Sequence, residues 1–513
     1  MSNASALFRS LLIYGLCLPL AVFLGYLLAT PLDITTIMVV VFILSMLAIP
    51  LLLRWHHAWL IATWNMSAVL FFVPGRPPVW MALAAISLVI SILQYALNRK
   101  MKFLHAPSIA WPLILLTVVI FVTARLTGGL SIRLFGGTVY GGKKYFIILA
   151  AVIGFFAIIN RQIPPKRANL YIALFFLGAA TVAIGELPGV LPPVFDFLFA
   201  FFPMISMDTF IGQNDVIAQT SLIGRQGGVS SLGVGGVCAM LACYGIRGIL
   251  DARKPWRLGV FCLFFLLTLL GGFRSTLIML LMTLALLFYL ERLHHTWLLL
   301  PMISVSLLGG GLIAAFASHL PLTFQRSLAF VPFLQIDPIV KMDAQSSTEW
   351  RLQLWRDVAP QIPQYLLVGK GYAFSGTEHQ QLGWETLEGF ELVGDYHSGP
   401  LSVILPFGIF GSIAFIWLIV AGIRVVYHNY QFGDPAYHNI NTFLFGYFVV
   451  KAIFFFTIFG SLHSDLPMFL GMLGLSISIN GGVAKPEVVP QQSAIVFNRF
   501  KLNPSARRPA GAS

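Results

Sequence analysis

The run HSGPLSVILPFGIFGSIAFIWLIV, residues 397–420, marks the point where a long polar segment gives way to a membrane span. The polar segment extends from Ser318 to Tyr396 in a chain that is otherwise almost entirely apolar. Nine of the chain's 19 acidic residues lie within it: Asp337, Asp343, Glu349, Asp357, Glu378, Glu385, Glu388, Glu391 and Asp395. We therefore expect the chemistry of the protein to take place here, beside the helix that follows.

The composition on either side of this segment is that of a membrane protein. Hydrophobic residues make up 58% of the chain and charged residues 10%, whereas soluble proteins carry about 25% charged residues. Apolar segments of spanning length begin near residues 10, 34, 57, 79, 108, 145, 168, 229, 258, 275, 297, 398, 440 and 464. Since a spanning helix needs about 20 apolar residues, we predict an all-α polytopic membrane protein with about 12–14 transmembrane helices and one large, partly helical loop.

This pattern divides the chain into five regions. They are N-terminal transmembrane helices (1–190), central transmembrane helices (191–316), the large loop (317–397), C-terminal transmembrane helices (398–482) and a tail predicted to be disordered (483–513).

Basic residues orient the chain, because they collect on the cytoplasmic side of a membrane. Short loops such as 161–167 and 247–257 are rich in Lys and Arg, which predicts cytoplasmic N- and C-termini. The large loop, Arg225 and Arg274 then all reach the outer face. The same bias accounts for most of the net charge of +13, so we expect membrane lipids and no nucleic acid as partners.

Within the large loop, Glu349–Asp357 is predicted to be helical and to end by Pro360. Arg351 and Trp355 are four residues apart and therefore share a face of this helix. Residues 369–372, with the sequence GKGY, are predicted to form a turn. The planar guanidinium of an arginine suits phosphate, so Arg351 is a candidate for gripping a diphosphate. The alternative is a surface ion pair with Glu349 or Asp357.

His397 lies where the polar loop meets the apolar span, directly after Asp395 and Tyr396. Histidine suits proton transfer near neutral pH, and a neighbouring carboxylate could orient its ring. The alternative is an interfacial histidine that caps the following helix or binds a backbone carbonyl.

Two further arginines are candidates on the same face. Arg225 opens the run RQGGVSSLGVGG, where helix N-terminal donors and a guanidinium could bind an anion. Glycine-mediated helix packing beside a solvent-seeking arginine is the alternative. Arg274 lies between two apolar runs, where an unpaired charge is costly. Lys451 lies within a span, and we assign it no role.

Other features suggest neither metal nor cofactor. The loop has no Asp-x-Asp pair, and the doublets His56/His57 and His294/His295 are interpreted as solvated residues at helix ends. All four cysteines lie in apolar segments. The glycine-rich run 127–142 predicts tight turns or a close backbone approach, with a flexible connector as the alternative. Any catalysis is expected to be independent of metals.

Taken in order, these motifs resemble a known family. The spacing Arg351-x3-Trp355, Gly369-x-Gly371 and His397-Ser398, followed by Gly408 and Gly411, resembles the O-antigen ligase and polymerase superfamily of bacterial membrane glycosyltransferases. Arg225 with its glycine-rich run matches an earlier arginine of that family. Phe273-Arg274-Ser275 departs from the family's Ser-Arg-Gly turn, which puts a role for Arg274 in doubt. The resemblance covers about residues 210–425.

The resemblance implies that an undecaprenyl-diphosphate-linked glycan is transferred to a glycan or lipid acceptor. The reaction would take place at the periplasmic face of the bacterial inner membrane, without nucleotide sugar, cofactor or metal. Arg225 and Arg351 would hold the diphosphate, with Arg274 and Arg356 added to this binding set. His397 would act as general base, giving inversion at the sugar carbon. The resemblance does not distinguish a ligase from a polymerase. It also does not identify the sugar, the acceptor or the oligomeric state.

Two other functions are considered. A transporter or flippase for an anionic lipid-linked sugar would predict inverted repeats and broken helices at the midplane, and we find neither. A non-enzymatic assembly protein for an envelope polysaccharide is the third possibility.

Overall fold

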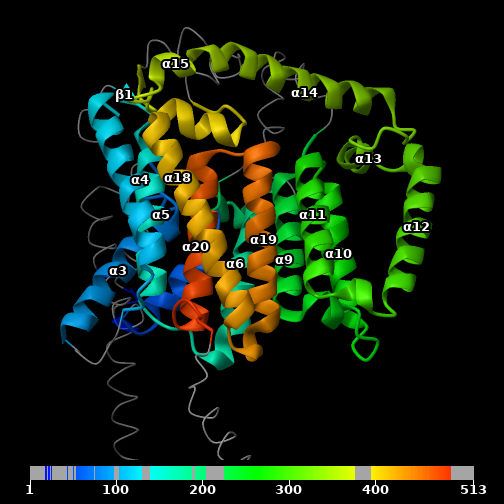
Figure 1. Ribbon diagram of the computed structural model, residues 1–513, viewed down its shortest axis with the longest axis horizontal. Coiled ribbons are helices and arrows are strands. Elements are labelled where there is room, and N and C mark those ends of the chain that lie inside the picture. Colours follow the sequence, from blue (N-terminus) through cyan, green and yellow to red (C-terminus); the bar gives the residue numbers. More distant parts are fainter. Residues whose placement is uncertain are drawn as a thin grey trace, which may run out of the picture.

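The computed structural model describes residues 53–73, 75–97, 103–129, 139–187, 191–203, 224–375 and 394–486, with a few isolated positions before residue 53. It confirms an all-α polytopic membrane protein (Figure 1). The apolar segments expected near residues 10 and 34, and nearly all of the tail 483–513, lie outside the described residues.

Nine helices of the described part are long and apolar enough to span a membrane. Seven of them are α3 (Val79–Leu97), α4 (Pro107–Leu126), α5 (Gly142–Ile159), α9 (Gly227–Ile249), α18 (Gly399–Phe432), α19 (His438–Thr457) and α20 (Leu462–Asn480). An eighth span joins η2 (Pro165–Arg167), α6 (Ala168–Leu177) and the 3₁₀ helix η3 (Gly178–Glu186). The ninth includes most of α12 (Leu299–Phe316) and η7 (Ala317–His319).

Two shorter apolar helices complete the pattern, α10 (Trp256–Leu270) and α11 (Arg274–Leu290). They correspond to the predicted spans near residues 258 and 275 and are separate helices. The span predicted near residue 57 is helical over the described residues 53–63. The minor elements are η4 (Pro193–Phe195), α7 (Leu198–Phe201), η6 (Leu293–His295) and η9 (Pro435–Tyr437).

The core of the bundle is formed by α9, α19 and α20, the most buried of the spans, whereas α12 stands at the edge (Figure 1). Small residues allow these helices to approach closely. A Cβ at Gly233 would collide with Thr268 on α10, and one at Gly235 would collide with the Phe176 carbonyl on α6. The glycine-rich run after Arg225 is therefore used for helix packing, the alternative that the sequence left open.

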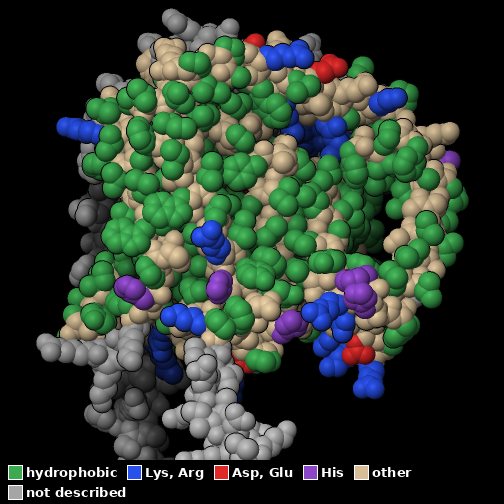
Figure 2. Space-filling view, viewed as in Figure 1, with side chains coloured by type: hydrophobic (Ala, Val, Ile, Leu, Met, Phe, Trp, Pro, Cys, Tyr) green, Lys and Arg blue, Asp and Glu red, His purple; other side chains and the backbone are tan. Residues whose placement is uncertain are grey.

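Polar side chains gather at both ends of the bundle, with a hydrophobic band between them (Figure 2). The large loop lies across one end as α13 (Leu322–Leu328), α14 (Pro338–Val358), η8 (Ala359–Gln361) and α15 (Ile362–Tyr365) (Figure 1). The predicted helix Glu349–Asp357 is the last part of α14, which begins at Pro338 with an Asp337 cap and ends before Pro360 as expected. Residues 376–393 of the loop lie outside the described part.

A pair of two-residue strands joins the large loop to the glycine-rich run 127–142. β1 (Val139–Tyr140) pairs antiparallel with β2 (Phe374–Ser375). Gly141 has φ +96° and lies so close to the Tyr372 carbonyl that any Cβ would overlap it. The close backbone approach predicted for this run is confirmed at Gly141.

The loop is also bound into a break in α18. Gly408 has φ +62°, which interrupts the helix, and Ile409 N donates to the Leu366 carbonyl (2.7 Å) instead of to its own helix. The Leu405 carbonyl then accepts from Lys370 N at 2.7 Å, and the Pro406 carbonyl accepts from Gly371 N at 3.0 Å. Both Gly369 and Gly371 have positive φ, whereas the turn lies at residues 366–368, directly before the predicted GKGY turn. Backbone hydrogen bonds thus attach the turn to the helix that follows His397.

One expectation is wrong. His56 and His57 are 1% and 5% exposed rather than solvated. His56 Nδ1 lies 2.7 Å from Ser87 Oγ, and His57 Nε2 lies 2.8 Å from the Ile158 carbonyl. One ring nitrogen of each histidine is thus paired inside the bundle, which an apolar neighbourhood in the sequence does not reveal.

Candidate active site

Four arginines from distant parts of the chain line one cavity of about 170 Å³. Arg225 precedes α9, Arg274 is the first residue of α11, Arg326 lies on α13 and Arg351 on α14. Hydroxyl groups of Ser275, Ser347 and Thr348 line the same space. The structure therefore brings together three of the sequence candidates and adds one arginine that sequence reasoning missed.

Arg326 is the missed residue, and it is fixed by a buried ion pair. Its Nε donates to Asp343 Oδ2 at 2.6 Å, and one of its terminal nitrogens donates to the Gly272 carbonyl at 2.7 Å. The Arg326 side chain is 3% exposed and that of Asp343 is fully buried. These contacts join α13, α14 and the turn before Arg274. No periodic signal links Arg326 to Asp343 in the sequence, so the pairing could not be read from it.

The pKa of Arg225 depends on its burial and on the charged groups around it. Burial, followed by the nearby Arg326, lowers its pKa to about 10, against the opposing effect of Asp343. It therefore stays charged at neutral pH. Its Nε is buried and has no hydrogen-bond partner among the described residues. A buried guanidinium nitrogen without a partner is costly, and an anionic ligand would satisfy it.

The N-terminus of α9 differs from the anion site that the sequence suggested. The Glu186 carboxylate accepts from Gly228 N at 2.6 Å and from Val229 N at 3.1 Å. Because a carboxylate of the protein itself already occupies these donors, Arg225 contributes to the cavity through its side chain and not through a free helix end.

Arg351 lies on the cavity side of α14 and is half-buried. Its guanidinium carbon lies 5.6 Å from the centroid of the Phe459 ring. Burial and the neighbouring Arg326 lower its pKa. Among the described residues it forms no ion pair with Glu349 or Asp357, the alternative considered for it. Arg356 is exposed and does not line the cavity.

His397 also contacts Phe459, with its ring centroid 5.4 Å from that of the phenylalanine. Trp350 on α14 contacts it edge to face at 5.2 Å, and Asp395 Oδ1 lies 3.8 Å from Nδ1. The backbone at His397 has φ +48°, a conformation that is uncommon outside glycine and is often found at functional sites. Burial lowers the pKa of His397 and Asp395 opposes this, so the imidazole is kept neutral, as a general base requires.

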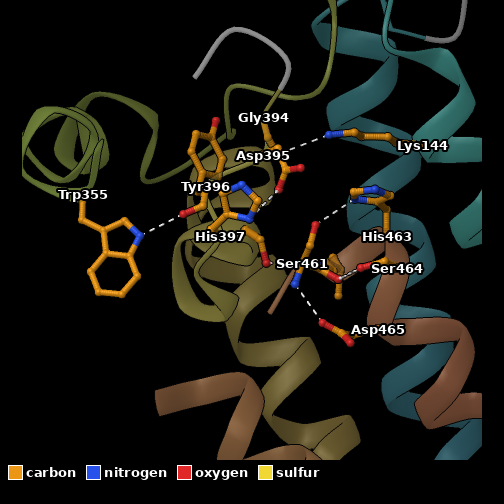
Figure 3. Close-up of polar contacts among 12 residues, drawn as sticks. Lys144, Trp355, Gly394, Asp395, Tyr396, His397, Ser461, His463, Ser464 and Asp465 are labelled. Atoms are coloured by element: carbon orange, nitrogen blue, oxygen red, sulfur yellow. Dashed lines mark hydrogen bonds and ion pairs between the residues drawn. The ribbon is translucent and has the colours of Figure 1, made fainter. Parts of the chain in front are cut away.

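Further hydrogen bonds hold the chain around His397 in place (Figure 3). Trp355 Nε1 donates to the Tyr396 carbonyl at 2.8 Å, which ties α14 to the residue before the histidine. Lys144 on α5 donates to the Gly394 carbonyl at 3.3 Å. Arg351 and Trp355 lie on the same face of α14 but have different neighbours. Arg351 lines the cavity, and Trp355 binds the backbone before His397.

The site combines two chemical capacities. Four guanidinium groups around one carboxylate give an excess of positive charge suited to a diphosphate, and they would stabilise it as a leaving group. A neutral imidazole contacts the same aromatic ring as Arg351. The catalytic and binding roles of these residues remain predictions.

The fold and the site define a polytopic membrane protein with a polycationic cavity at one end of its bundle. Residues 229–416 match the family model for O-antigen ligase, which supports a relationship of this part of the chain to the O-antigen ligase superfamily. The match supports a role as a ligase- or polymerase-like glycosyltransferase that acts on a lipid-linked glycan and an acceptor. A comparison with curated proteins gives no match.

Proposed function

We propose that this protein transfers or polymerises a glycan from an undecaprenyl-diphosphate carrier onto a glycan or lipid acceptor. The reaction takes place at the periplasmic face of the bacterial inner membrane. The observation that carries the proposal is the convergence of Arg225, Arg274, Arg326 and Arg351 on one cavity within the matched family region or directly beside it.

In this proposal the cavity binds the diphosphate and His397 activates the acceptor. The acceptor hydroxyl oxygen attacks the anomeric carbon as the bond to the diphosphate oxygen breaks. The hydroxyl proton passes to the imidazole of His397, and the diphosphate leaves with the bonding electrons. Because Nδ1 faces Asp395, Nε2 is the nitrogen that takes the proton. A single displacement inverts the configuration at that carbon.

The arginines act on the charge that develops as the bond breaks. Negative charge grows on the diphosphate in the transition state, and donors already fixed in a cavity stabilise it without reorganisation. Arg326 is held by Asp343 and Gly272, so its guanidinium is oriented before any substrate binds. Arg225 and Arg351 have no carboxylate partner among the described residues, and they supply further donors.

The test is a transfer reaction with purified protein in detergent, undecaprenyl-diphosphate-linked glycan and defined acceptors. Formation of the glycosylated acceptor with release of undecaprenyl diphosphate supports the proposal, and the acceptor used separates ligase from polymerase. A transporter or an assembly protein would release no undecaprenyl diphosphate under these conditions. Absence of turnover with every acceptor class, from folded protein that binds the donor, would overturn the proposal.

A further inference from the structure

A buried ion pair joins the last two membrane helices near the site. Lys451 on α19 and Asp465 on α20 are 2.6 Å apart, between Nζ and Oδ1, with side chains that are 14% and 10% exposed. Charges buried in a membrane segment are costly unless they are paired, and they mark functional positions more often than structural ones. Neither residue lines the arginine cavity.

The second oxygen of Asp465 binds the turn between these helices. Asp465 Oδ2 accepts from Ser461 N at 2.8 Å, and Ser461 Oγ lies 2.9 Å from His463 Nδ1 (Figure 3). Each carboxylate oxygen therefore has its own partner. Lys451 fixes one side of the carboxylate, and the other side is directed at the backbone of the turn.

This turn, residues 458–461, packs directly against the start of α18. Gly460 lies so close to Gly399 that a Cβ at position 460 would be 3.0 Å from the Gly399 Cα. Leu462 N donates to Ser402 Oγ at 3.0 Å. The turn and the first residue of α20 are thus positioned against Gly399 and Ser402, near the start of α18.

The same turn carries an aromatic ring that contacts both functional groups of the site. Phe459 contacts the His397 imidazole at 5.4 Å and the Arg351 guanidinium at 5.6 Å. Ile458, one residue earlier, lines the arginine cavity. The position of the turn therefore sets the position of an aromatic surface that both groups share.

We propose that Asp465 is a positioning residue that holds the turn 458–461, with Lys451 as the partner that balances its buried charge, so that Phe459 keeps Arg351 and His397 in their working arrangement. This inference rests on the proposed function, because it assigns an indirect role in the same reaction. Displacement of the turn would leave both side chains chemically unchanged. It would shift them from their positions in the site and admit water beside His397. A misplacement of about 1 Å can cost roughly a hundredfold in rate.

Two matched double variants test it. Lys451→Met with Asp465→Asn removes the buried charges but keeps a side-chain oxygen for Ser461 N. Lys451→Met with Asp465→Ala removes the charges and that oxygen. We expect the Asn form to keep turnover within about threefold of wild type, and the Ala form to lose roughly tenfold to a hundredfold in kcat with little change in KM for the lipid donor.

A pH profile separates positioning from simple loss of fold. His397 is surrounded by Asp395, Arg351, Arg225 and Lys144, and burial is the largest influence on its pKa. If Phe459 moves away, hydration raises that pKa toward its ordinary value. The acidic limb of kcat should then move to higher pH in the Ala form but not in the Asn form.

A measurement independent of activity completes the test. With 4-fluorophenylalanine at position 459, the ¹⁹F resonance should match wild type in the Asn form and shift or broaden in the Ala form. Equal kcat, equal pH profiles and one common resonance for both forms would overturn the positioning role. If the unmodified protein transfers no glycan, the proposed function fails, whereas the ¹⁹F comparison still decides whether Asp465 holds the turn.

Discussion

The guanidinium carbon of Arg351 lies 5.6 Å from the centroid of the Phe459 ring, which is a cation–π contact. The same ring contacts the histidine, with 5.4 Å between ring centroids. One aromatic side chain therefore contacts both an arginine of the positive cavity and the candidate base. This arrangement leads to predictions about charge, protonation, packing and backbone conformation.

The first prediction concerns the planar fork of Arg351. Replacement by lysine keeps the charge but loses bidentate donation to a diphosphate, so kcat/KM for the lipid donor should fall roughly tenfold to a hundredfold. The measurement is the initial rate of glycan transfer against donor concentration. Lys341→Gln, a charge change on the exposed side of the same helix, is the control and should have little effect. Full activity of Arg351→Lys would remove the diphosphate clamp.

The second prediction is a pH dependence set by His397. Its pKa lies below the ordinary value of 6.5 because of burial, and the neutral form is the active base. With His397 as the proposed base, we expect kcat to rise with pH through an apparent pKa below 6.5. Trp350→Ala opens one side of the ring to water and should move this limb to higher pH.

The same shift affects stability in a definite direction. The unfolded chain binds a proton on this histidine at a higher pH than the folded chain does, so its contribution to the free energy of unfolding declines as pH falls through the ordinary pKa. His397→Gln should reduce that decline in unfolding measurements between neutral and mildly acidic pH. An unchanged pH dependence of stability in that variant would contradict a buried, neutral histidine.

The third prediction concerns the ion pair between Arg326 and Asp343. Asp343→Leu leaves a buried guanidinium with no carboxylate, and removing one partner of such a pair costs about 3–5 kcal/mol. The double variant Arg326→Met with Asp343→Leu should recover much of that stability. It should not recover transfer, because the cavity has lost an arginine. Unfolding in detergent, measured beside the transfer rate, shows whether the two properties separate in this way.

The fourth prediction concerns the break in α18. Gly408 has φ +62°, and a Cβ there would collide with the Leu366 carbonyl. Gly408→Ala should therefore destabilise the junction by more than the ~1–2 kcal/mol that a left-handed backbone costs a non-glycine residue. Transfer should fall as the loop loses its attachment. Gly259→Ala on α10 is the matched control, since nothing lies within 4 Å of its Cβ position.

Much of this site could be predicted from residue types and spacing. A polar loop in an apolar chain is visible from composition alone, and Arg351, Trp355 and His397 lie in it at distinctive spacing. The helix around Arg351 and a turn close to Gly369 follow from local rules that operate within a few residues. The charge bias also placed Arg225 and Arg274 on the same side as the loop, which the structure joins in one cavity.

The rest depends on contacts between distant segments. Arg326 on α13 pairs with Asp343 on α14, and nothing in the sequence of either helix indicates this pairing. Phe459 is one of several phenylalanines in an aromatic-rich stretch of the sequence. Only the structure shows that it follows α19 and contacts both Arg351 and His397. Arg356 shows the opposite case: it is a loop arginine close to Arg351 in sequence, but helix geometry points it to the exposed side. The spacing of Arg351 and Arg356 places them on different faces of α14, but only the structure shows which face lines the cavity.

The most direct measurement of the central claim is transfer by purified His397→Ala beside wild type, with undecaprenyl diphosphate and glycosylated acceptor quantified together. Wild type should release the two products in equal amounts and with inversion at the anomeric carbon. The variant should stay folded and bind the donor with unchanged affinity, since the arginines remain, but should transfer no measurable glycan. Wild-type transfer rates in the folded variant, or retention of configuration in the product, would contradict the account.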